Sequence, residues 1–505
     1  MYSKIHEWGI QHKIDFNPNK TKCVVFNKPG HPNLYLRTPT IRMNCHSIKV
    51  EKSIKYLGVW MDHRLGWDDH IKYITNRTNL IFQAFSQIAR RKWGLNSEAM
   101  GVIYDYTYMP IITYACGSWG WAAKKVHSHR KLISSQRKGL ILISKAYRTT
   151  PNTSLQVITK RPPITDIINN RYQLWNLKMG QDIHTTSLTI PAARYEGMCT
   201  TADLPAPYIN DYIITDSPMD SDLNIYTDGS GINGNTGCAF VVYGNNSEIF
   251  HQGFKLDSLC SVFQAELKAI HLAIIWIEEY YNNLKITIYT DCQSAISLIN
   301  SDKPHPITIA IKKAVLHSSN RYYISWTQGH QGTIGNERAD QLAKQAANDN
   351  SLQPIYSKLS LSTIKNLLHK DLINCWQSSW SQNHSNSTFN FIPDITTYLN
   401  QKITIDPDSI QLITGHGKFS SYLHRFTGKH SPLCAICREV DGPDHYLYRC
   451  VCLERDRLAI EITAKDMNIP WPCPHHELIN NKDLYPLLQK LAHNYSRIAT
   501  NTTRD

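Results

Sequence analysis

The chain has 505 residues, of which 42% are hydrophobic, so it can hold about three domains of ordinary size with well-filled cores. A secreted or membrane-spanning protein is not expected, because no signal peptide opens the sequence and no apolar stretch could cross a bilayer. The thirteen cysteines are scattered along the chain, which suits reduced thiols in an intracellular protein, either nuclear or cytoplasmic. The net charge of +13 is concentrated in residues 1–210, with 29 Lys and Arg against 12 Asp and Glu, which favours a polyanionic partner, although basic surfaces also occur for solubility alone.

The front of the chain, residues 1–150, has the pattern of an α+β segment. Met1 to Val59 predicts a short helix and then strands, among them the apolar run Cys23 to Phe26 after an Asn-Pro-Asn turn. The stretch from Ser53 to Asp62 predicts a further strand. A helix is expected from about Trp67 to Lys92, where it ends in a basic cluster.

Several short strings in this front section carry a resemblance. They are Asn17-Pro-Asn-Lys-Thr-Lys, Lys55-Tyr-Leu-Gly-Val and Leu65-x-Trp-x-x-His-Ile, followed by the stretch Thr107 to Trp121. As an ordered set they resemble the end of the palm, the thumb and the connection of reverse transcriptases from non-long-terminal-repeat retrotransposons. The resemblance implies a partial α+β palm and a helical thumb in residues 1–150.

A polymerase of that class needs a hairpin with paired aspartates and an earlier metal-binding aspartate, and the sequence has no such pattern. The adjacent Asp68 and Asp69 belong to the thumb-like string, where the helix dipole favours acids in the first turn. We therefore expect that the chain does not polymerise DNA and that it resembles a truncated reading frame that begins inside the palm.

Residues 151–220 are expected to form a connection helix and a linker. A helix is predicted at Asn169 to Lys178, and the prolines between Pro191 and Pro218 favour irregular structure. The next domain is expected to begin near residue 220.

Residues 221–350 have a regular secondary-structure pattern. Strands are predicted at 223–227, 237–243, 248–256, 284–290 and 322–327, and helices at 261–280, 292–299, 307–316 and 340–347. Asn-Gly-Asn and Gly-Asn-Asn turns join the first three strands into an antiparallel meander. If the two strands that end at Asp228 and Asp291 pair, these acids emerge at neighbouring strand ends.

Four acids of this segment recur in distinctive surroundings. Asp228 and Asp291 each follow a Tyr-Thr pair, Glu266 lies early in a helix, and Asp340 opens the last helix. Four converging carboxylates would repel one another unless cations sat between them, and Mg²⁺ prefers such oxygen ligands. Two such ions can stabilise the attacking and leaving oxygens of a phosphodiester displacement. The alternative is four ordinary surface acids at strand ends and helix starts.

The order of these acids and their local strings, with the Trp-Thr-Gln-Gly-His segment before the last of them, closely resemble the ribonuclease H family. The resemblance implies an α/β fold with a mixed five-stranded sheet flanked by helices, acting on the RNA strand of RNA–DNA hybrids. It implies that Asp228 bridges two Mg²⁺ ions, for which Mn²⁺ can substitute, and that Glu266, Asp291 and Asp340 complete their shells. His330 would assist proton transfer or product departure.

Other polar residues of this segment are interpreted as structural. Lys312 and Lys313 lie where some relatives present a basic helix to the hybrid, but a solvated helix face is preferred. Gly229 to Gly231 could let a nucleic-acid strand approach the backbone, and an ordinary turn explains them as well. A structural or surface role is expected for three histidines, His271, His305 and His317.

Residues 351–505 are predicted to form a helical tail with a helix at 362–380 and a small cysteine-rich motif. The motif has the spacing C-x₂-C-x₇-H-x₄-C and comprises Cys434, Cys437, His445 and Cys450. Three thiolates and one imidazole suit tetrahedral Zn²⁺, and the same tail occurs in the resembled retroelements. Cys452 could replace Cys450, and the alternative to a zinc site is a set of free cysteines near a histidine.

The sequence thus predicts a retroelement-derived ribonuclease H that binds RNA–DNA hybrid, RNA or DNA and has no membrane partner. A rival is a non-catalytic nucleic-acid-binding remnant, whose binding through the basic front and the tail would fall steeply with salt. A third hypothesis is a decayed reading frame without a selected role. The oligomeric state is not predicted.

Overall fold

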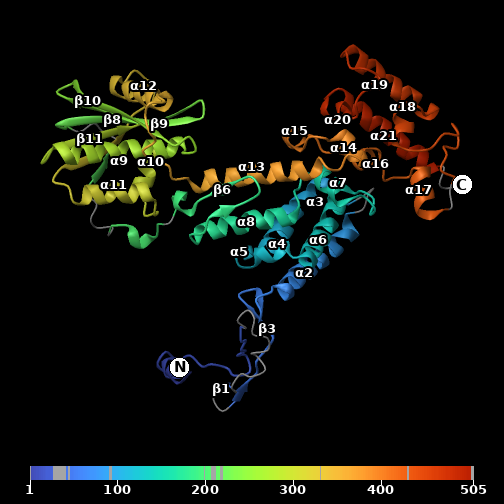
Figure 1. The fold of residues 1–505 in the computed structure, drawn as a ribbon, viewed down its shortest axis with the longest axis horizontal. Helices are drawn as coiled ribbons and strands as arrows, with labels where there is room; N and C mark the ends of the chain where they lie inside the picture. Colours follow the sequence, from blue (N-terminus) through green and yellow to red (C-terminus); the bar gives the residue numbers. More distant parts are fainter. Residues whose placement is uncertain are drawn as a thin grey trace. The chain divides into compact units, whose positions relative to one another are not determined.

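The structure is a computed structural model that describes residues 2–26, 41–43, 46–89, 94–197, 199–205, 212–215, 220–329, 331–428 and 431–501 (Figure 1). Its internal contacts divide the chain into two compact units. Unit 1 comprises Met1–Tyr172 and Leu372–Asp505, and unit 2 comprises Gln173–Asp371. In the described part of the chain, no helix combines the length and the apolar character that crossing a bilayer requires.

Unit 2 is built on a six-stranded mixed sheet with the order β10-β9-β8-β11-β12-β7 (Figure 1). The strands are β7 (Tyr212–Thr215), β8 (Leu223–Ile232), β9 (Asn235–Gly244), β10 (Ser247–Leu256), β11 (Lys285–Thr290) and β12 (Arg321–Trp326). β8, β9 and β10 form the antiparallel meander expected from the sequence, and β8, β11, β12 and β7 run parallel to one another.

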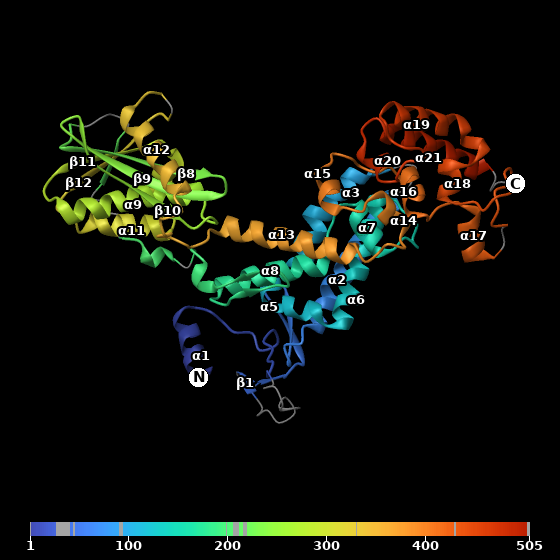
Figure 2. The same ribbon diagram turned by 45° about the horizontal axis from the view of Figure 1, so that its top comes forward.

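Helices cover both faces of this sheet. They are α9 (Val262–Tyr280), α10 (Gln293–Ile299), α11 (Pro306–Leu316) and α12 (Ile334–Asn348). Figures 1 and 2 show α9 and α11 on one side of the sheet and α12 on the other. The alternation of side chains along β8 fits this layering: Ile225 is in the core shared with α9, while Tyr226 packs toward Gly335 of α12.

The mixed sheet flanked by helices is the ribonuclease H-like fold that the resemblance implied, but the sheet has six strands instead of the expected five. β7 lies in the stretch predicted to be linker and pairs in parallel with β12. Tyr212 anchors it, because this side chain is buried and its hydroxyl donates to the Ile299 carbonyl at 2.9 Å. A four-residue strand in a proline-rich segment gives little periodicity, so the sequence pattern did not reveal it.

The two short turns of the meander have the backbone that their residues favour. Asn233 and Gly234 have φ of 52° and 78°, and Asn245 and Asn246 have φ of 49° and 62°. Positive φ at both central residues belongs to the two-residue hairpin turns that match strand twist, and Asn and Gly tolerate it best.

Four short elements and two longer helices complete unit 2 or run across its sequence limits. They are α8 (Ile164–Lys178), β5 (Ile183–His184), β6 (Thr189–Ile190), η4 (Ala192–Arg194), η5 (Thr201–Asp203) and α13 (Leu361–Trp380). Within unit 2, Leu177, Tyr195 and Leu359 belong to one small buried cluster. The predicted domain start near residue 220 therefore falls inside a unit that begins at Gln173.

The front part of unit 1 is mainly helical. Its elements are α1 (Tyr2–Gln11), β1 (Ile41–Met43), β2 (His46–Ile48), β3 (Ser53–Tyr56), β4 (Val59–Asp62), α2 (Asp68–Ile88), α3 (Ser97–Ile103), the π-helical turn η2 (Tyr104–Tyr108), α4 (Met109–Thr113), α5 (Cys116–Trp119), η3 (Gly120–Lys124), α6 (Val126–Ser144) and α7 (Asn152–Ile158). The predicted strand Cys23–Phe26 is wrong, because only an isolated bridge joins Cys23 to Val50. The single strand predicted at Ser53–Asp62 is a hairpin, since the chain turns at Leu57 and Gly58, both with positive φ.

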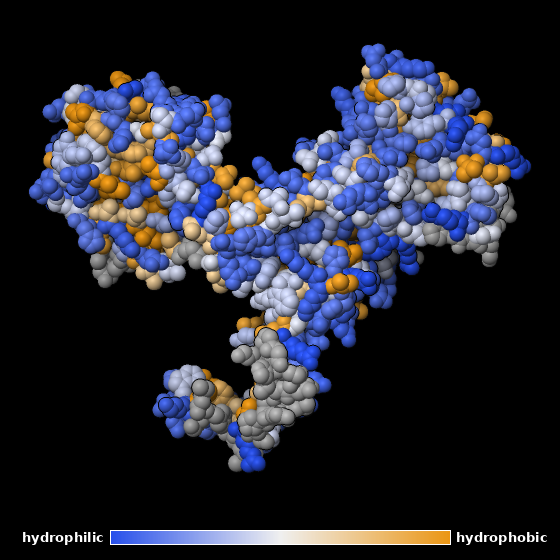
Figure 3. Space-filling model, in the orientation of Figure 1, coloured by the Kyte–Doolittle hydropathy of each residue, from blue (hydrophilic) through white to orange (hydrophobic). Residues whose placement is uncertain are grey.

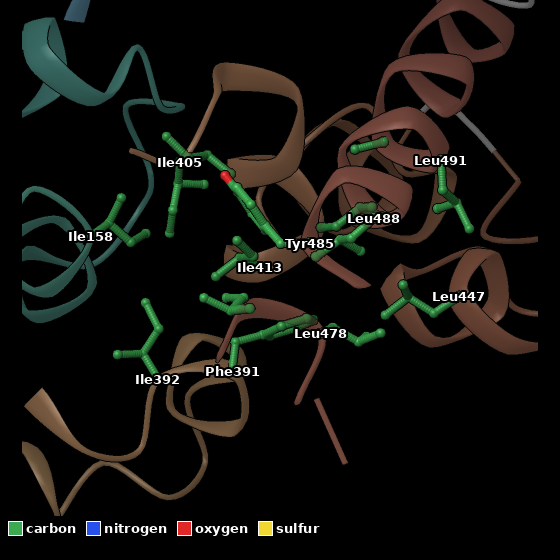
Figure 4. Close-up of a cluster of buried hydrophobic side chains, with 14 of the residues drawn as sticks. Ile158, Phe391, Ile392, Ile405, Ile413, Leu447, Leu478, Tyr485, Leu488 and Leu491 are labelled. Atoms are coloured by element: carbon green, nitrogen blue, oxygen red, sulfur yellow. The ribbon is translucent and has the colours of Figure 1, made fainter. Parts of the chain in front are cut away.

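The tail contributes the rest of unit 1. Its helices are α14 (Ser387–Phe391), α15 (Ile395–Asn400), α16 (Pro407–Thr414), α17 (Ser420–Thr427), α18 (Pro443–Tyr448), η6 (Val451–Leu453), α19 (Glu454–Asp466), α20 (Glu477–Asn480) and α21 (Leu484–Asn501). Figure 4 shows their core, in which Ile158 of α7 lies among tail side chains such as Phe391, Leu478 and Leu488. Residues 372–505 thus share a core with α7 rather than forming a separate body.

Exposed apolar side chains in unit 2 are interspersed with hydrophilic ones, as the face in Figure 3 shows. Ile249 of β10, and Val262 and Ile275 of α9, are each between 43% and 46% exposed. Single apolar residues of this kind are normal on protein surfaces. The acidic residues at one end of the sheet are the more informative feature.

Candidate active site

Asp228 and Asp291 lie side by side at the end of the parallel pairing between β8 and β11. The register pairs Thr227 with Thr290, so the next residue of each strand is one of the two acids. This confirms the neighbouring strand ends that the sequence predicted. β11 stops there, whereas β8 continues to Ile232 against β9, so Asp228 is held within a ladder.

Glu266 reaches the same place from the second turn of α9. The helix starts with a capping box, in which Ser261 Oγ accepts from the Gln264 amide at 3.2 Å and Gln264 Oε1 accepts from the Ser261 amide at 2.9 Å. Gly229 of β8 allows the close approach, because a Cβ there would lie 2.5 Å from the Glu266 backbone nitrogen. Gly229 is thus a strand residue that packs against a helix, not a turn residue.

The three carboxylates form one cluster. Asp228, Glu266 and Asp291 each offer an oxygen, and these atoms lie within 4.8 Å of one another. Asp228 and Glu266 are each only 6% exposed, and Glu266 Oε2 is buried without a hydrogen-bond partner. A buried carboxylate oxygen without a donor is costly, so this geometry calls for a cation.

The charge balance of the cluster agrees with that need. Burial, and then the charges of Asp291 and Asp340, raise the pKa of Asp228 to about 7. Burial, and then the charge of Asp228, raise the pKa of Glu266 to about 9, although a hydrogen bond with the Gly229 backbone opposes this rise. Without a cation the site therefore retains protons that ordinary carboxyl groups would lose.

Asp340 stands apart from the three-carboxylate cluster. Its Oδ2 lies 2.6 Å from Lys344 Nζ, one helical turn further along α12. Its charge still acts on the site, since it raises the pKa of both Asp228 and Glu266. The prediction that Asp340 opens its helix is wrong, because α12 begins at Ile334. The next two residues of the helix are Gly and Asn, which are weak helix formers, so the sequence pattern did not indicate the true start.

The predicted His330 lies outside the described residues. Two hydrogen bonds join the segment just before it to the end of β11. Trp326 Nε1 donates to the Asp291 carbonyl at 3.1 Å, and the Thr327 amide donates to the Thr290 carbonyl at 3.0 Å. The tryptophan contact could not be predicted from the sequence, because a hydrogen bond from a side chain to a backbone carbonyl leaves no spacing pattern.

Other polar residues of the unit have structural contacts. Lys312 is buried and donates to the Ser301 carbonyl at 2.8 Å, so the solvated helix face predicted for it is wrong, whereas Lys313 is exposed. The three histidines contact neighbouring groups: His271 the Lys268 ammonium, His305 the Glu196 carboxylate, and His317 the Lys313 carbonyl.

A second cluster of metal-ligand type occurs in the tail of unit 1. One atom from each of four residues lies within 4.8 Å of the other three, and the residues are Cys434, Cys437, His445 and Cys450. Cys450 rather than Cys452 is the fourth member. Burial raises the pKa of the Cys450 thiol above its usual range, and the Val451 amide donates to Cys437 Sγ at 3.5 Å.

The imidazole of this second cluster is oriented by a carboxylate. His445 Nδ1 donates to Glu439 Oε2 at 3.2 Å, and Arg449 Nε lies 3.4 Å from the same oxygen. His445 Nε2 is buried and has no hydrogen-bond partner, so its lone pair is available to coordinate a metal ion. Three thiols and a free imidazole nitrogen fit a zinc ion.

Comparison with known proteins places unit 2 in a family. The family model described as RNase H matches residues 220–348. The solved structure of RNase H1 from the halophilic archaeon Halobacterium salinarum NRC-1 is 18% identical and covers 25% of this chain and 96% of that chain, with a TM-score of 0.21. Residues 220–348 are thus similar to the RNase H family.

The relatives of the chain are retrotransposon proteins. A retrovirus-related Pol polyprotein from type-1 retrotransposable element R1 4 of Nasonia vitripennis is 29% identical over 35% of this chain and 45% of its own length. The corresponding R1 Pol polyprotein of Bradysia coprophila is 25% identical over 30% of this chain and 15% of its own length. A probable RNA-directed DNA polymerase from transposon X-element of Drosophila melanogaster is 28% identical over 33% and 18%, respectively. The chain thus spans less than half the length of each of these three relatives.

Proposed function

We propose that unit 2 is a metal-dependent endonuclease that cuts the RNA strand of RNA–DNA hybrids. One observation carries the proposal: Asp228, Glu266 and Asp291, from two neighbouring strands and a helix, bring carboxylate oxygens within 4.8 Å of one another. The buried Glu266 Oε2 without a donor makes the all-oxygen site suitable for Mg²⁺, with Mn²⁺ as a substitute. The ribonuclease H domain and the retrotransposon relatives support the choice of substrate class.

In this proposal the three clustered acids would hold Mg²⁺, and Asp340 would help to hold a second ion. Bound Mg²⁺ would supply charge stabilisation for the attacking water oxygen and the leaving 3′-oxygen of an in-line displacement. Asp228 and Glu266 would act only after giving up the protons that burial favours. The hydrogen bond from Trp326 Nε1 to the Asp291 carbonyl holds the backbone of Asp291 at the end of β11. His330 would accept or deliver a proton as the product leaves.

The balanced step is a hydrolysis. A water oxygen forms a new bond to phosphorus and gives up a proton to solvent or to His330. The bond between phosphorus and the ribose 3′-oxygen breaks, and the leaving 3′-oxygen takes up a proton. The products are a 3′-hydroxyl end and a 5′-phosphate end. Recognition of RNA rather than DNA would use the 2′-hydroxyl groups in the wide minor groove.

A cleavage assay on the full chain tests the proposal. Labelled RNA in a hybrid should be cut with Mg²⁺ and not with EDTA, and double-stranded DNA should remain intact. Asp291→Asn should abolish cutting, because the amide cannot supply the anionic oxygen that the ion needs. Asp220→Asn is the matched control, since this exposed acid precedes the opposite end of β8. Cutting that survives Asp291→Asn would reject the site.

The tail cluster supports a second, separate role. We propose that Cys434, Cys437, His445 and Cys450 hold a structural Zn²⁺ that fixes the segment around α18. This proposal is independent of cleavage, because a chelator selective for Zn²⁺ over Mg²⁺ should unfold the motif and leave the carboxylate site of unit 2 unchanged. Mass spectrometry under native conditions should find one zinc per chain, and Cys437→Ser should lose it.

The rival hypothesis of a non-catalytic nucleic-acid-binding protein makes a different prediction for the same samples. It predicts that hybrid binds in a strongly salt-dependent way and that no cut product forms with any divalent ion. The absence of polymerase activity also stays a prediction. A primer-extension assay with the full chain should yield no extended product.

A further inference from the structure

Lys344 is the cationic side chain that sits beside the acidic site. It lies one turn after Asp340 on α12, and its Nζ is 2.6 Å from Asp340 Oδ2. Its side chain is 43% exposed and that of Asp340 is 21% exposed, so the pair borders solvent. The pair is therefore at the open edge of the site rather than in its interior.

The ammonium group is held on the Asp340 side of the site. Lys344 Nζ donates to Asp340 Oδ2 at 2.6 Å. Among the described residues, no lysine, arginine or histidine forms an ion pair with Asp228, Glu266 or Asp291.

The geometry of the acids also separates Asp340 from the other three. Asp228, Glu266 and Asp291 form a compact set with oxygens within 4.8 Å, and Asp340 does not belong to it. An ion between the three compact acids would therefore displace no ion pair formed by the described residues. An ion between Asp228 and Asp340 would have to take a carboxylate that Lys344 already holds.

We propose that Lys344 is a tethered cation that competes with the second divalent ion and makes the two ions bind in order. This inference rests on the proposed function. The first ion enters the compact set of acids, and the second binds only when Lys344 releases Asp340. Because a partly exposed ion pair is weak, millimolar Mg²⁺ or an arriving phosphate can displace the lysine.

The proposal differs from an ordinary helix-stabilising role. An exposed pair four residues apart on a helix adds little to stability, and its removal would leave metal binding unchanged. A competing cation has the opposite signature: its removal should improve the binding of one ion. Since few substitutions improve ligand binding by chance, the sign of the change is informative.

The test is calorimetric titration of the full chain with Mg²⁺ in the absence of nucleic acid. Three variants are compared with the wild type: Lys344→Met, Lys344→Arg and the charge-matched control Lys313→Met on α11. In Lys344→Met the dissociation constant of the second ion should fall by about three- to ten-fold, and that of the first by less than about two-fold. Lys344→Arg and Lys313→Met should resemble the wild type.

Two results overturn the inference. The first is an unchanged second-site affinity in Lys344→Met, with an unchanged unfolding midpoint in metal-free buffer showing that the variant folds. The second is a loss of hybrid affinity in Lys344→Met without any change in the Mg²⁺ titration, which would assign the lysine to a substrate phosphate. If the wild type binds no divalent ion, the proposed function fails, and the inference is rejected with it.

Discussion

Asp291 occupies the space that a side chain on Gly329 would need. A Cβ built on Gly329 would lie 2.6 Å from Asp291 Oδ2 and 3.4 Å from its Cγ. The nearest atom is the end of a side chain rather than backbone, so a methyl group there would turn the carboxylate aside without breaking the sheet. The absence of a side chain at position 329 therefore keeps a proposed metal ligand in place.

Gly329→Ala should weaken metal binding more than it weakens the fold. We expect the Mg²⁺ dissociation constant to rise by about ten-fold and hybrid cleavage to fall with it, because displacement of a ligand by a few tenths of an ångström degrades coordination geometry. Calorimetric titration and the metal-free unfolding midpoint are the measurements. Gln328→Ala, at the adjacent exposed residue, is the control. Equal metal affinity in both variants would contradict the prediction.

The metal-free protein should lose stability as pH rises. The pKa values of Asp228, about 7, and Glu266, about 9, lie above the ordinary value near 4, so the folded state holds protons that the unfolded chain releases. The contribution of these two groups to the free energy of unfolding is therefore greatest below about pH 4. It declines by several kcal/mol at most as the pH rises to about 9. Saturating Mg²⁺ should remove the decline because it binds the deprotonated acids.

The measurement is the thermal midpoint of unfolding across pH, with Mg²⁺ and with EDTA. The double variant Asp228→Asn, Glu266→Gln isolates these groups from other titrating residues, and its metal-free curve should be flatter than that of the wild type between about pH 5 and pH 9. Identical slopes in the two proteins would show that the buried acids do not behave as described.

Glu439 should control the affinity of the tail cluster for zinc. Its carboxylate accepts from His445 Nδ1, which leaves the buried Nε2 without a hydrogen-bond partner. Glu439→Gln should raise the zinc dissociation constant by about ten-fold, because partners of this kind typically contribute ten- to hundred-fold. Competition with a zinc chelator measures the affinity, and the d–d spectrum of the Co²⁺-loaded protein reports the ligand set. Glu454→Gln, on α19, is the control, and equal losses in both variants would argue against an orienting role.

Gly229→Ala should destabilise unit 2 strongly. A Cβ at this position would lie 2.5 Å from the Glu266 nitrogen and 2.9 Å from the Ala265 carbonyl carbon, both of which are backbone atoms of α9. The helix must shift, at a cost on the order of 3 kcal/mol. Gly244→Ala is the comparison, since its nearest contact would be 3.3 Å from a Leu223 methyl group. Hydrogen exchange of β8 amides should accelerate in the first variant and change little in the second.

The site could be predicted from sequence where local patterns set the geometry. β8 and β11 each carry an alternating run that leads into the same Tyr-Thr-Asp string, so their parallel pairing brings Asp228 and Asp291 together. The first turn of α9 has a recognisable capping box, which fixes where Glu266 lies on the helix. These features depend on residues near one another in the chain, and periodicity reveals them.

The remaining features depend on contacts between distant segments. β7 is too short to show a period, and its place beside β12 is set by the burial of Tyr212. Lys312 looks solvated in sequence, yet it turns inward to the Ser301 carbonyl. The ion pair of Asp340 with Lys344 corresponds to a spacing of four residues on a helix. Its position beside the acidic site depends on Asp228, and sequence spacing does not show that relation.

The division of the chain has a consequence for synthesis. Residues 173–371 leave the ribosome as a complete unit, whereas the core around Val157 and Ile158 is closed by side chains of the tail, from Leu372 onward. Domains generally fold as units while the chain grows. Unit 2 can therefore complete its fold before the tail residues that cover α7 have been synthesised. A message cut short just after residue 371 would encode a complete unit 2 without the residues that close the core of unit 1.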